Sequence, residues 1–380
     1  MHAHDPFRFA LYFSTLRDTR VRNRCDHRLL DVVIMALCAV IGNCNDWQQI
    51  ALFARERRDW FARFLPLPNG TPSHDTFERV FERISPEAFQ KCFRDWVRAV
   101  TASLDIPHIA IDGKTLRGSG DRPARLGALH LVSAWATEAH LSLGQVAVDT
   151  KSNEITAIPK LLELLELKGA VVTIDAIGCQ KEIARQIVDR GGEYLLAVKG
   201  NQGNLHSDIQ SSLEKAMDGE AGIDYQIHTT EETHHGRKEK RLYVVMKKLE
   251  GIRDRELWKD LSVIGMCVCE REVDGVAKPE ARYFISSEDI SAEDLGKLTR
   301  HHWRIENNLH WQLDVTFRED ANQVAARRGA ENLALLRRLA LSLLKHEGSK
   351  QSMACKRLQA CMSTTYLEKV LVSVDKLGKD

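Results

Sequence analysis

The first part of the chain, residues 1–105, repeats apolar positions at helical spacing. The stretch HRLLDVVIMALCAVIG is apolar almost all round, which is typical of a buried helix, and DWQQIALFARERRDWFARFL is amphipathic. Ser73 or Asp75 is the expected N-cap of a short helix, and Pro86 suits the first turn of another. No strand pattern occurs in this stretch, so we predict an N-terminal all-α domain.

From residue 106 the pattern changes to short buried strands that alternate with helices. PHIAIDG and ALHLVSAWATEAHLSLGQVAVDT predict three strands, the last two joined by a turn near 137–139. SNEITAIPKLLELLEL, AVVTID, QKEIARQIVDR and EYLLAVKG then predict helix, strand, helix and strand. Three antiparallel strands followed by βα units is the order of a ribonuclease-H-like domain. We therefore predict an α/β fold, a mixed sheet with flanking helices, whose first part covers residues 106–200.

Residues 201–285 interrupt this order and predict a β-rich insertion. Its expected strands are YQIHTTEETHHGRKEKRLYVVMKK, LSVIGMCVCEREV and ARYFISS. Over residues 286–345 the helical pattern resumes and completes the core, followed by a C-terminal helical tail over 346–380. Glu306 borders an apolar stripe at helical spacing, which consists of Leu298, Ile305, Leu309 and Leu313.

The composition is that of an ordinary soluble protein. Apolar residues make up 43% and charged residues 28%, with a net charge of +1, so any surface that binds nucleic acid must be local. The longest apolar run is too short to span a bilayer, and the N-terminus lacks the layout of a signal peptide. We therefore expect a cytoplasmic protein without a membrane partner. The nine cysteines lack zinc-knuckle spacing and are expected to be reduced thiols.

Two acidic residues end buried strands. Asp112 ends the first predicted strand and Asp175 the fourth, and in the expected strand order these ends lie side by side. Glu306, at the edge of its helical stripe, could face them. Three carboxylates so close would raise one another's pKa unless a cation neutralises them, and oxygen ligands select Mg²⁺ or Mn²⁺. Two such ions suit cleavage of a phosphodiester.

Each of these residues also has a simpler interpretation. Asp112 precedes a glycine, which is a common turn pair, and Asp175 could cap a helix. Glu306 could lie on a solvated face. The spacing of His302, Glu306 and His310 could suggest zinc, but that would leave the strand-end aspartates unexplained. Taken together, the three carboxylates favour a metal site.

Several long strings occur in the order of one protein family. They are LPNGTPSHDTFERVFERISPEAF, IAIDGKTLRGS, KSNEITAIPKLLELL, DAIGCQKEIA, YLLAVKGNQGNL, HGRKEKR, YFISS and HHWRIENNLHWQLDVTFRED. In these strings the chain resembles the H-repeat-associated transposases, which are insertion-sequence transposases of the DDE type. The resemblance implies a ribonuclease-H-like catalytic domain with a β insertion before its last helix. It also implies that Asp112, Asp175 and Glu306 are the catalytic triad and the metal ligands.

The same resemblance implies a reaction and its partners. The enzyme would use two Mg²⁺ or Mn²⁺ ions to cut DNA at the ends of an insertion element, and the freed 3′-hydroxyl would then attack target DNA. A homodimer would bring the two ends together, in the cytoplasm of a bacterium and associated with the nucleoid when bound to DNA. Two alternatives share these residues: a metal-dependent DNA nuclease without strand transfer, and a decayed transposase that only binds DNA.

One signature of related transposases is absent. They carry Tyr, Arg, Glu and Lys on the last catalytic helix, at positions −7, −4, 0 and +7 from the Glu. The corresponding residues here are Thr299, His302, Glu306 and Leu313. The resemblance therefore does not carry over hairpin formation at the element ends.

DNA contacts are expected where cations, amides or an aromatic ring lie near the triad, and along a basic stretch of the β-rich insertion, because affinity for DNA comes mostly from contacts with its phosphates. The helices of residues 1–105 are candidates for binding the terminal inverted repeats. The expected DNA-binding residues are Lys114, Arg117, Lys199, Asn201, Gln202, His235, Arg237, Arg300, Trp303, Arg304, Asn307 and His310.

Overall fold

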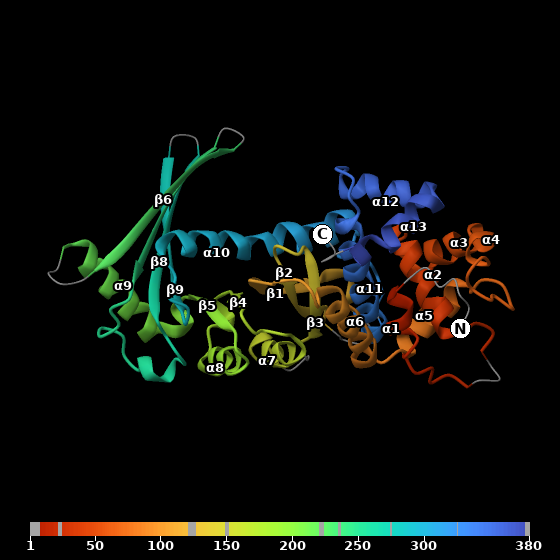
Figure 1. Cartoon of the computed structure of the whole chain (residues 1–380), viewed down its shortest axis with the longest axis horizontal. Coiled ribbons are helices and arrows are strands. Elements are labelled where there is room, and N and C mark those ends of the chain that lie inside the picture. Colours follow the sequence, from red (N-terminus) through yellow and green to blue (C-terminus); the bar gives the residue numbers. More distant parts are fainter. Residues whose placement is uncertain are drawn as a thin grey trace.

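The chain forms an elongated molecule with a helical end, a central sheet and a second β-rich end (Figure 1). Its computed structural model describes residues 8–21, 25–120, 127–148, 152–219, 224–234, 237–273, 276–324 and 326–376. None of the helices in these ranges is both long and apolar enough to cross a membrane.

The N-terminal part is helical up to residue 101, and no strand precedes His108 among the described residues. Its helices are α1 (Arg8–Phe13), α2 (Leu29–Ile41), α3 (Trp47–Glu56), α4 (Arg58–Phe61), α5 (His74–Arg83) and α6 (Pro86–Thr101). Ser73 is the N-cap of α5, as expected, and Pro86 begins α6. Helix α2 is buried on nearly all sides, which explains its almost uniformly apolar sequence.

The central sheet has the ribonuclease-H-like order that the sequence predicts. Its first five strands are β1 (His108–Leu116), β2 (Leu129–Ala136), β3 (Leu141–Ala147), β4 (Val171–Ile174) and β5 (Glu193–Val198). They lie in the order β3-β2-β1-β4-β5, with β1, β2 and β3 antiparallel and with β4 and β5 parallel to β1. The predicted mixed α/β fold is therefore confirmed.

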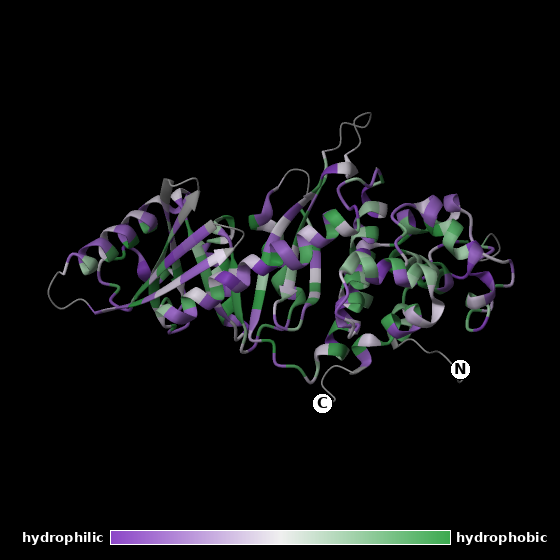
Figure 2. Cartoon of the chain, turned by 90° about the horizontal axis from the view of Figure 1, so that it is seen from above, coloured by the Kyte–Doolittle hydropathy of each residue, from purple (hydrophilic) through white to green (hydrophobic). Residues whose placement is uncertain are grey.

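Helices cover this sheet on both sides. Helix α7 (Glu154–Leu164) leads from β3 to β4, and α8 (Lys181–Asp189) leads from β4 to β5. Figure 1 shows α7 and α8 along one side of the sheet and the long helix α10 (Ala292–Ile305) along the opposite side. The hydropathy of the residues follows this layering, because apolar residues gather in the central strands and in the helices that pack on them (Figure 2).

The β-rich segment extends the same sheet. Helix α9 (Gly203–Met217), which the sequence pattern did not predict, comes first. Its strands are β6 (Tyr225–His234), β7 (Arg237–Met246), β8 (Val263–Val273) and β9 (Val276–Ser286). Strand β9 pairs antiparallel with β5, so the whole forms one nine-stranded sheet, β3-β2-β1-β4-β5-β9-β8-β7-β6. The domain boundaries expected from the sequence stay a prediction.

Helix α10 spans the junction between the two halves of this sheet. It packs on β6, β7 and β8 near its start and on β4 and β1 further along. The helical course continues through η6 (Glu306–His310) and η7 (Gln312–Thr316), which are π-helical turns. Ile305, Leu309 and Leu313 of the predicted apolar stripe are fully buried. The described chain ends with three α-helices and a 3-10 turn: α11 (Arg327–His346), α12 (Met353–Met362), α13 (Thr364–Leu371) and η8 (Ser373–Lys376).

Buried arginines join these parts. Arg338 of α11 and Glu319, which follows η7, are both fully buried, with Nη1 of Arg338 3.2 Å from a carboxylate oxygen of Glu319. Arg338 also donates to the hydroxyl of Ser133 in β2. Arg357 of α12 donates to the carbonyl of Val40 in α2 and stacks on the ring of Phe317. These contacts fix the end of the π-helical segment against the sheet and the N-terminal helices.

Removing one partner of the buried pair would leave an uncompensated charge in the core. We expect Glu319→Ala to lower the free energy of unfolding by about 3–5 kcal/mol. Glu293→Ala, which breaks an exposed pair with Lys297, is the control and should leave the free energy of unfolding close to that of the wild type. Urea denaturation followed by tryptophan fluorescence measures both values. Equal losses in the two variants would show that the buried pair is not a major support of the fold.

Candidate catalytic site

Asp112 and Asp175 occupy matching positions on neighbouring parallel strands. Residues of β1 and β4 pair with a constant offset, from His108 with Val171 to Ile111 with Ile174, and the two aspartates are the next residue on each strand. Strand β4 ends there because the Asp175 carboxylate accepts a hydrogen bond from the N–H of Ile177 and turns the chain into η3 (Ala176–Gly178). The expected juxtaposition is thus confirmed, and Asp175 is also the helix cap of the simpler interpretation.

Glu306 reaches this edge from the end of α10, where the helix changes its hydrogen bonding. The N–H of Trp311 bonds to the carbonyl of Glu306, and the N–H of Phe317 bonds to the carbonyl of Gln312, so each bond spans five residues. In an α-helix, side chains four residues apart drift round the axis because a turn holds 3.6 residues. A π turn holds more residues and opposes that drift.

The wider turns keep one ridge of side chains, spaced four residues apart, against β1 and β4. Nδ1 of His302 lies 3.0 Å from the hydroxyl of Thr173, and Nε2 of His310 lies 3.3 Å from a carboxylate oxygen of Asp112. Further along, Asp314 pairs with Lys114 at 2.6 Å. Glu306 lies between His302 and His310 on this ridge, so it faces Asp112.

The three carboxyl groups affect one another's charge. Burial and the negative charge of Asp112 raise the pKa of Asp175. Burial also raises the pKa of Glu306, and the negative charge of Asp112 raises it further. At Asp112 burial again acts to raise the pKa, but the adjacent imidazoles of His310 and His302 outweigh it, so the pKa is lowered. Asp112 is therefore the carboxylate that stays ionised most readily.

This donor set fits a hard divalent cation. All three groups offer oxygen ligands, and the pKa values of Asp175 and Glu306 are raised first by burial and then by the negative charge of Asp112. The three carboxylates lie further apart than the ligands of a site that encloses a single ion. Within the described ranges, the His, Asp and Glu group whose ligand atoms all lie within 4.8 Å of one another is a different one, His108, Glu138 and His301.

The residues expected to bind DNA near the end of β1 differ in their exposure. Lys114 is only 8% exposed, and its ammonium pairs with Asp314 at 2.6 Å and with Asp320 at 3.1 Å. A phosphate could reach it only by displacing one of these carboxylates. Arg117, in η2 (Arg117–Ser119), keeps 84% of its side chain exposed despite a loose pair with Asp320.

The turn after β5, which contains η4 (Gly200–Gln202), holds the loop that follows Asp175. Asn201 donates to the carbonyl of Ala176 at 2.7 Å, and Gln202 donates to the carbonyl of Cys179 at 2.8 Å. These amides therefore face the protein. Lys199 beside them is exposed.

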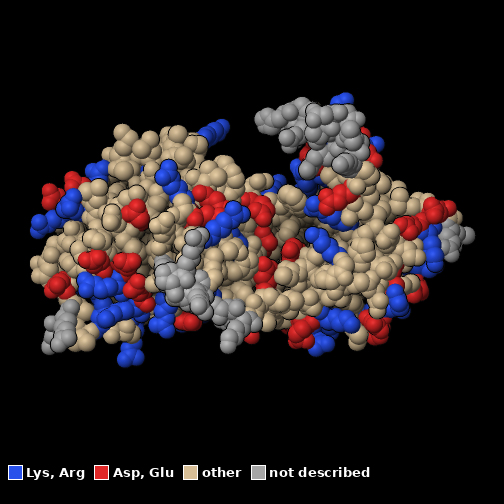
Figure 3. Space-filling view, turned by 180° about the vertical axis from the view of Figure 1, so that it is seen from behind, with Lys and Arg blue, Asp and Glu red and all other residues tan. Residues whose placement is uncertain are grey.

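The remaining expected DNA contacts are dispersed. Arg300 of α10 pairs with Glu232 of β6 at 2.9 Å, and Trp303 is 52% exposed beside the guanidinium of Arg282. Arg304 and Asn307 are exposed, whereas His310 is buried against Asp112. His235 lies outside the described residues, as does the side chain of Arg237. From behind, Lys and Arg are interspersed with Asp and Glu, and no broad basic face is visible (Figure 3).

A fourth carboxylate, which the sequence did not single out, lies beside the triad. Glu154 begins α7 and contributes to the raised pKa of Asp175. Its carboxylate lies 2.6 Å from Nε2 of His130, whose Nδ1 lies 2.7 Å from the hydroxyl of Thr115. Gly113 leaves room for this pair, because a Cβ at that position would displace the ends of the Glu154 and His130 side chains. A cavity of about 350 Å³ opens next to this group.

The sequence matches two family descriptions. Residues 10–97 match the family described as DDE_Tnp_1-associated, and residues 103–343 match the family described as Transposase DDE domain. With the ribonuclease-H-like sheet and the acidic edge, these matches define a transposase of the DDE class. The chain belongs to the Transposase DDE domain family, within its H-repeat-associated group.

Similar proteins are known from Escherichia coli. "Putative transposase YncI" of strain O157:H7 is 40% identical over 97% of this chain and 95% of its own length. "H repeat-associated putative transposase YhhI" of strain K12 is 39% identical over 95% of this chain and 96% of its own length. Among solved structures, a chain of the piggyBac transposase synaptic complex with hairpin DNA has a TM-score of 0.40 at 12% identity, covering 95% of this chain and 76% of that one. A likeness of that degree supports no conclusion about the present chain.

Removing His310 should change the pH range in which the site can hold a metal ion. In His310→Asn, the larger of the two imidazole effects that lower the pKa of Asp112 is lost, so the carboxylate keeps its proton to higher pH. As the pH is lowered, we expect the variant to lose Mn²⁺ binding at a higher pH than the wild type does. At neutral pH we expect its Mn²⁺ affinity to be about 10-fold weaker. Calorimetric titration at a series of pH values measures this. His206→Asn, which changes a histidine packed on Tyr283, is the control, and identical profiles would contradict the role of His310.

A substitution of Asn201 distinguishes between two roles for its side chain, holding the loop after Asp175 and contacting DNA. If Asn201 acts by holding the loop after Asp175, Asn201→Ala should lower metal-dependent cleavage about 10-fold and leave DNA affinity unchanged. If it contacts DNA, as the sequence suggested, affinity should fall while the cleavage rate at saturating DNA is kept. Single-turnover cleavage and a binding titration without metal distinguish the two.

Proposed function

We propose that this chain is a metal-dependent DNA transposase that cuts DNA at the ends of an insertion element and joins the freed ends to target DNA. The observation that supports this most directly is the register of β1 and β4. It brings Asp112 beside Asp175, while Glu306 reaches them from a helix 131 positions further along the chain (306 − 175 = 131).

The residues that would hold the ions are Asp112, Asp175 and Glu306, and the ions would be Mg²⁺ or Mn²⁺, two in number. Such a pair supplies positive charge to both the attacking and the leaving oxygen of an in-line displacement. His310 keeps Asp112 ionised and ready to accept a cation. The amides of Asn201 and Gln202 hold the loop that positions Asp175.

The substrate of this reaction would be DNA, bound through local rather than general charge. The net charge of +1 gives the molecule no overall attraction for phosphates, so contacts must come from exposed groups near the acidic edge. Arg117, Lys199, Arg304 and Asn307 are exposed and available. The helices of the N-terminal part would bind the terminal inverted repeats. A homodimer would hold both ends, in bacterial cytoplasm and at the nucleoid when bound to DNA.

The decisive substitution is Asp175→Asn, because an amide oxygen still accepts the hydrogen bond that caps η3 while the negative charge is lost. Removing a residue that only hydrogen-bonds to a metal ligand typically lowers activity about 10–100-fold. Removing the charge of a ligand itself should cost more, so we expect the cleavage rate to fall at least about 100-fold. The assay uses labelled DNA that carries the element ends, an unlabelled target, and Mg²⁺ or Mn²⁺. Asp189→Asn, an exposed change at the end of α8, is the matched control.

Each outcome of this assay has a distinct meaning. Nicking at the element ends and joined products that both vanish in Asp175→Asn support a transposase. Nicking without joined products would favour a nuclease, and specific binding without nicking would favour a decayed protein. Cleavage that persists in Asp175→Asn would refute the assignment of the triad.

A further inference from the structure

A second cluster of potential ligands lies on the same face of β1 as Asp112, at the start of the strand. His108 is 2% exposed, and its two ring nitrogens each lie 2.9 Å from a hydroxyl, those of Thr137 and Thr173. Glu138 is in the turn between β2 and β3, and His301 is in α10. Three separate elements therefore converge on one point.

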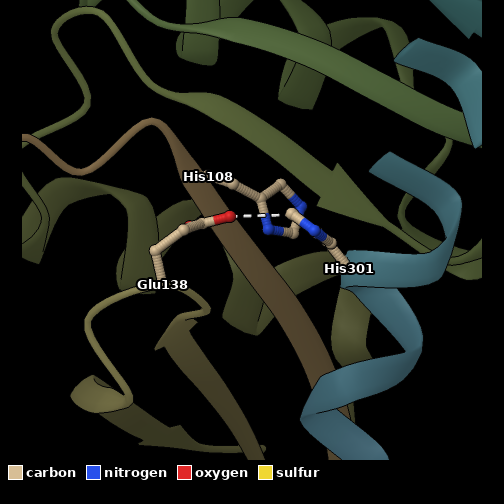
Figure 4. A group of neighbouring side chains, drawn as sticks. All are labelled: His108, Glu138 and His301. Carbon is tan, nitrogen blue, oxygen red and sulfur yellow. Dashed lines mark ion pairs between the residues drawn. The ribbon is translucent and has the colours of Figure 1, made fainter. Parts of the chain in front are cut away.

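The geometry within this cluster is compact. Nδ1 of His301 lies 2.8 Å from a carboxylate oxygen of Glu138, and one ligand atom from each of the three residues lies within 4.8 Å of the others. The ring centroids of His108 and His301 are 5.7 Å apart. Figure 4 shows the Glu138 carboxylate directed toward the two imidazole rings, with His301 reaching in from the helix on the right of the view.

We propose that His108, Glu138 and His301 form a second metal site, which binds a transition-metal ion of the Zn²⁺ class. Two imidazoles and one carboxylate suit Zn²⁺, and water can complete a tetrahedral shell. Mg²⁺, which prefers oxygen ligands, would instead select the carboxylates of the triad. The two sites therefore differ in ligand chemistry as well as in position.

An ion at this site would fix the helix that carries Glu306. It would join the start of β1, the β2–β3 turn and α10 at a point five residues before Glu306 (306 − 301 = 5). The hydroxyl of Thr173 lies within hydrogen-bond distance of both His108 and His302, so the ion would also border the ridge that faces Asp112. Its role is to position the helix, and it would take no direct part in cleavage.

The surroundings permit ion binding. Burial lowers the pKa of both imidazoles, that of His108 to about 3, so each ring is neutral and offers a lone pair at neutral pH. Threonine hydroxyls rotate and both donate and accept, so His108 can release one of them to an ion. Arg304 opposes a cation here, but its side chain is exposed and solvent screens its charge.

Metal titration of the full chain tests this site independently of activity. Chelator-treated protein would be titrated with Zn²⁺, and separately with Co²⁺, in excess Mg²⁺ that occupies the triad. We expect one Zn²⁺ per chain and the strong visible absorption of tetrahedral Co²⁺. Loss of a residue that only hydrogen-bonds to a metal ligand usually weakens metal binding about 10–100-fold. Glu138→Gln and His301→Gln each remove a direct ligand, so each should weaken Zn²⁺ binding by more than this. Zn²⁺ should raise the thermal midpoint of the wild type but not of these variants.

Three variants make the result specific. Glu293→Gln and His74→Gln are the matched surface controls and should bind Zn²⁺ like the wild type. Asp175→Asn should also keep the Zn²⁺ site while losing cleavage, so the two proposals can fail separately. Glu138 is in a turn and partly exposed, so its variant should fold even if His301→Gln does not. A wild type that binds no stoichiometric Zn²⁺, or binding that survives Glu138→Gln, would overturn the proposal.

Discussion

Mutual repulsion among carboxylates at one edge of the sheet is the constraint on which the proposed catalytic site depends. Asp112 and Asp175 are fixed side by side by the register of β1 and β4, and their backbones cannot move apart without breaking the sheet. Glu306 is added by a helix that buries Leu309 and Leu313 just beyond it, so packing free energy offsets the repulsion. A site held in this way is preorganised for a cation, because binding relieves repulsion rather than creating order.

The sequence could predict the parts of this arrangement that have local signals. Strand and helix patterns gave the order of elements, and that order alone places the ends of the first and fourth strands together, with Asp112 and Asp175 on them. The apolar stripe around Ile305 gave the face of the last helix. The π turns have no comparable signal, because the contacts that accompany them, of His310 with Asp112 and of Asp314 with Lys114, join residues some 200 positions apart.

Long-range pairings account for what the sequence could not show. Lys114 was expected to meet phosphate, but its partners Asp314 and Asp320 come some 200 residues later and bury its charge. Glu154 looked like the start of a helix, and only the fold brings it beside Asp175. The pairing of β9 with β5, which joins the insertion to the central sheet, leaves no trace in either strand's pattern.

That pairing also has a consequence for the evolution of such chains. Strand β5 has β4 on one side and β9 on the other, so its backbone groups are satisfied only while the β-rich segment is present. A shortened chain without this segment would keep both aspartates and Glu306, yet it would present the open flank of β5 to solvent. Unpaired strand flanks invite association with other chains. Deletions within the gene would therefore tend to yield insoluble protein before they yielded a smaller enzyme.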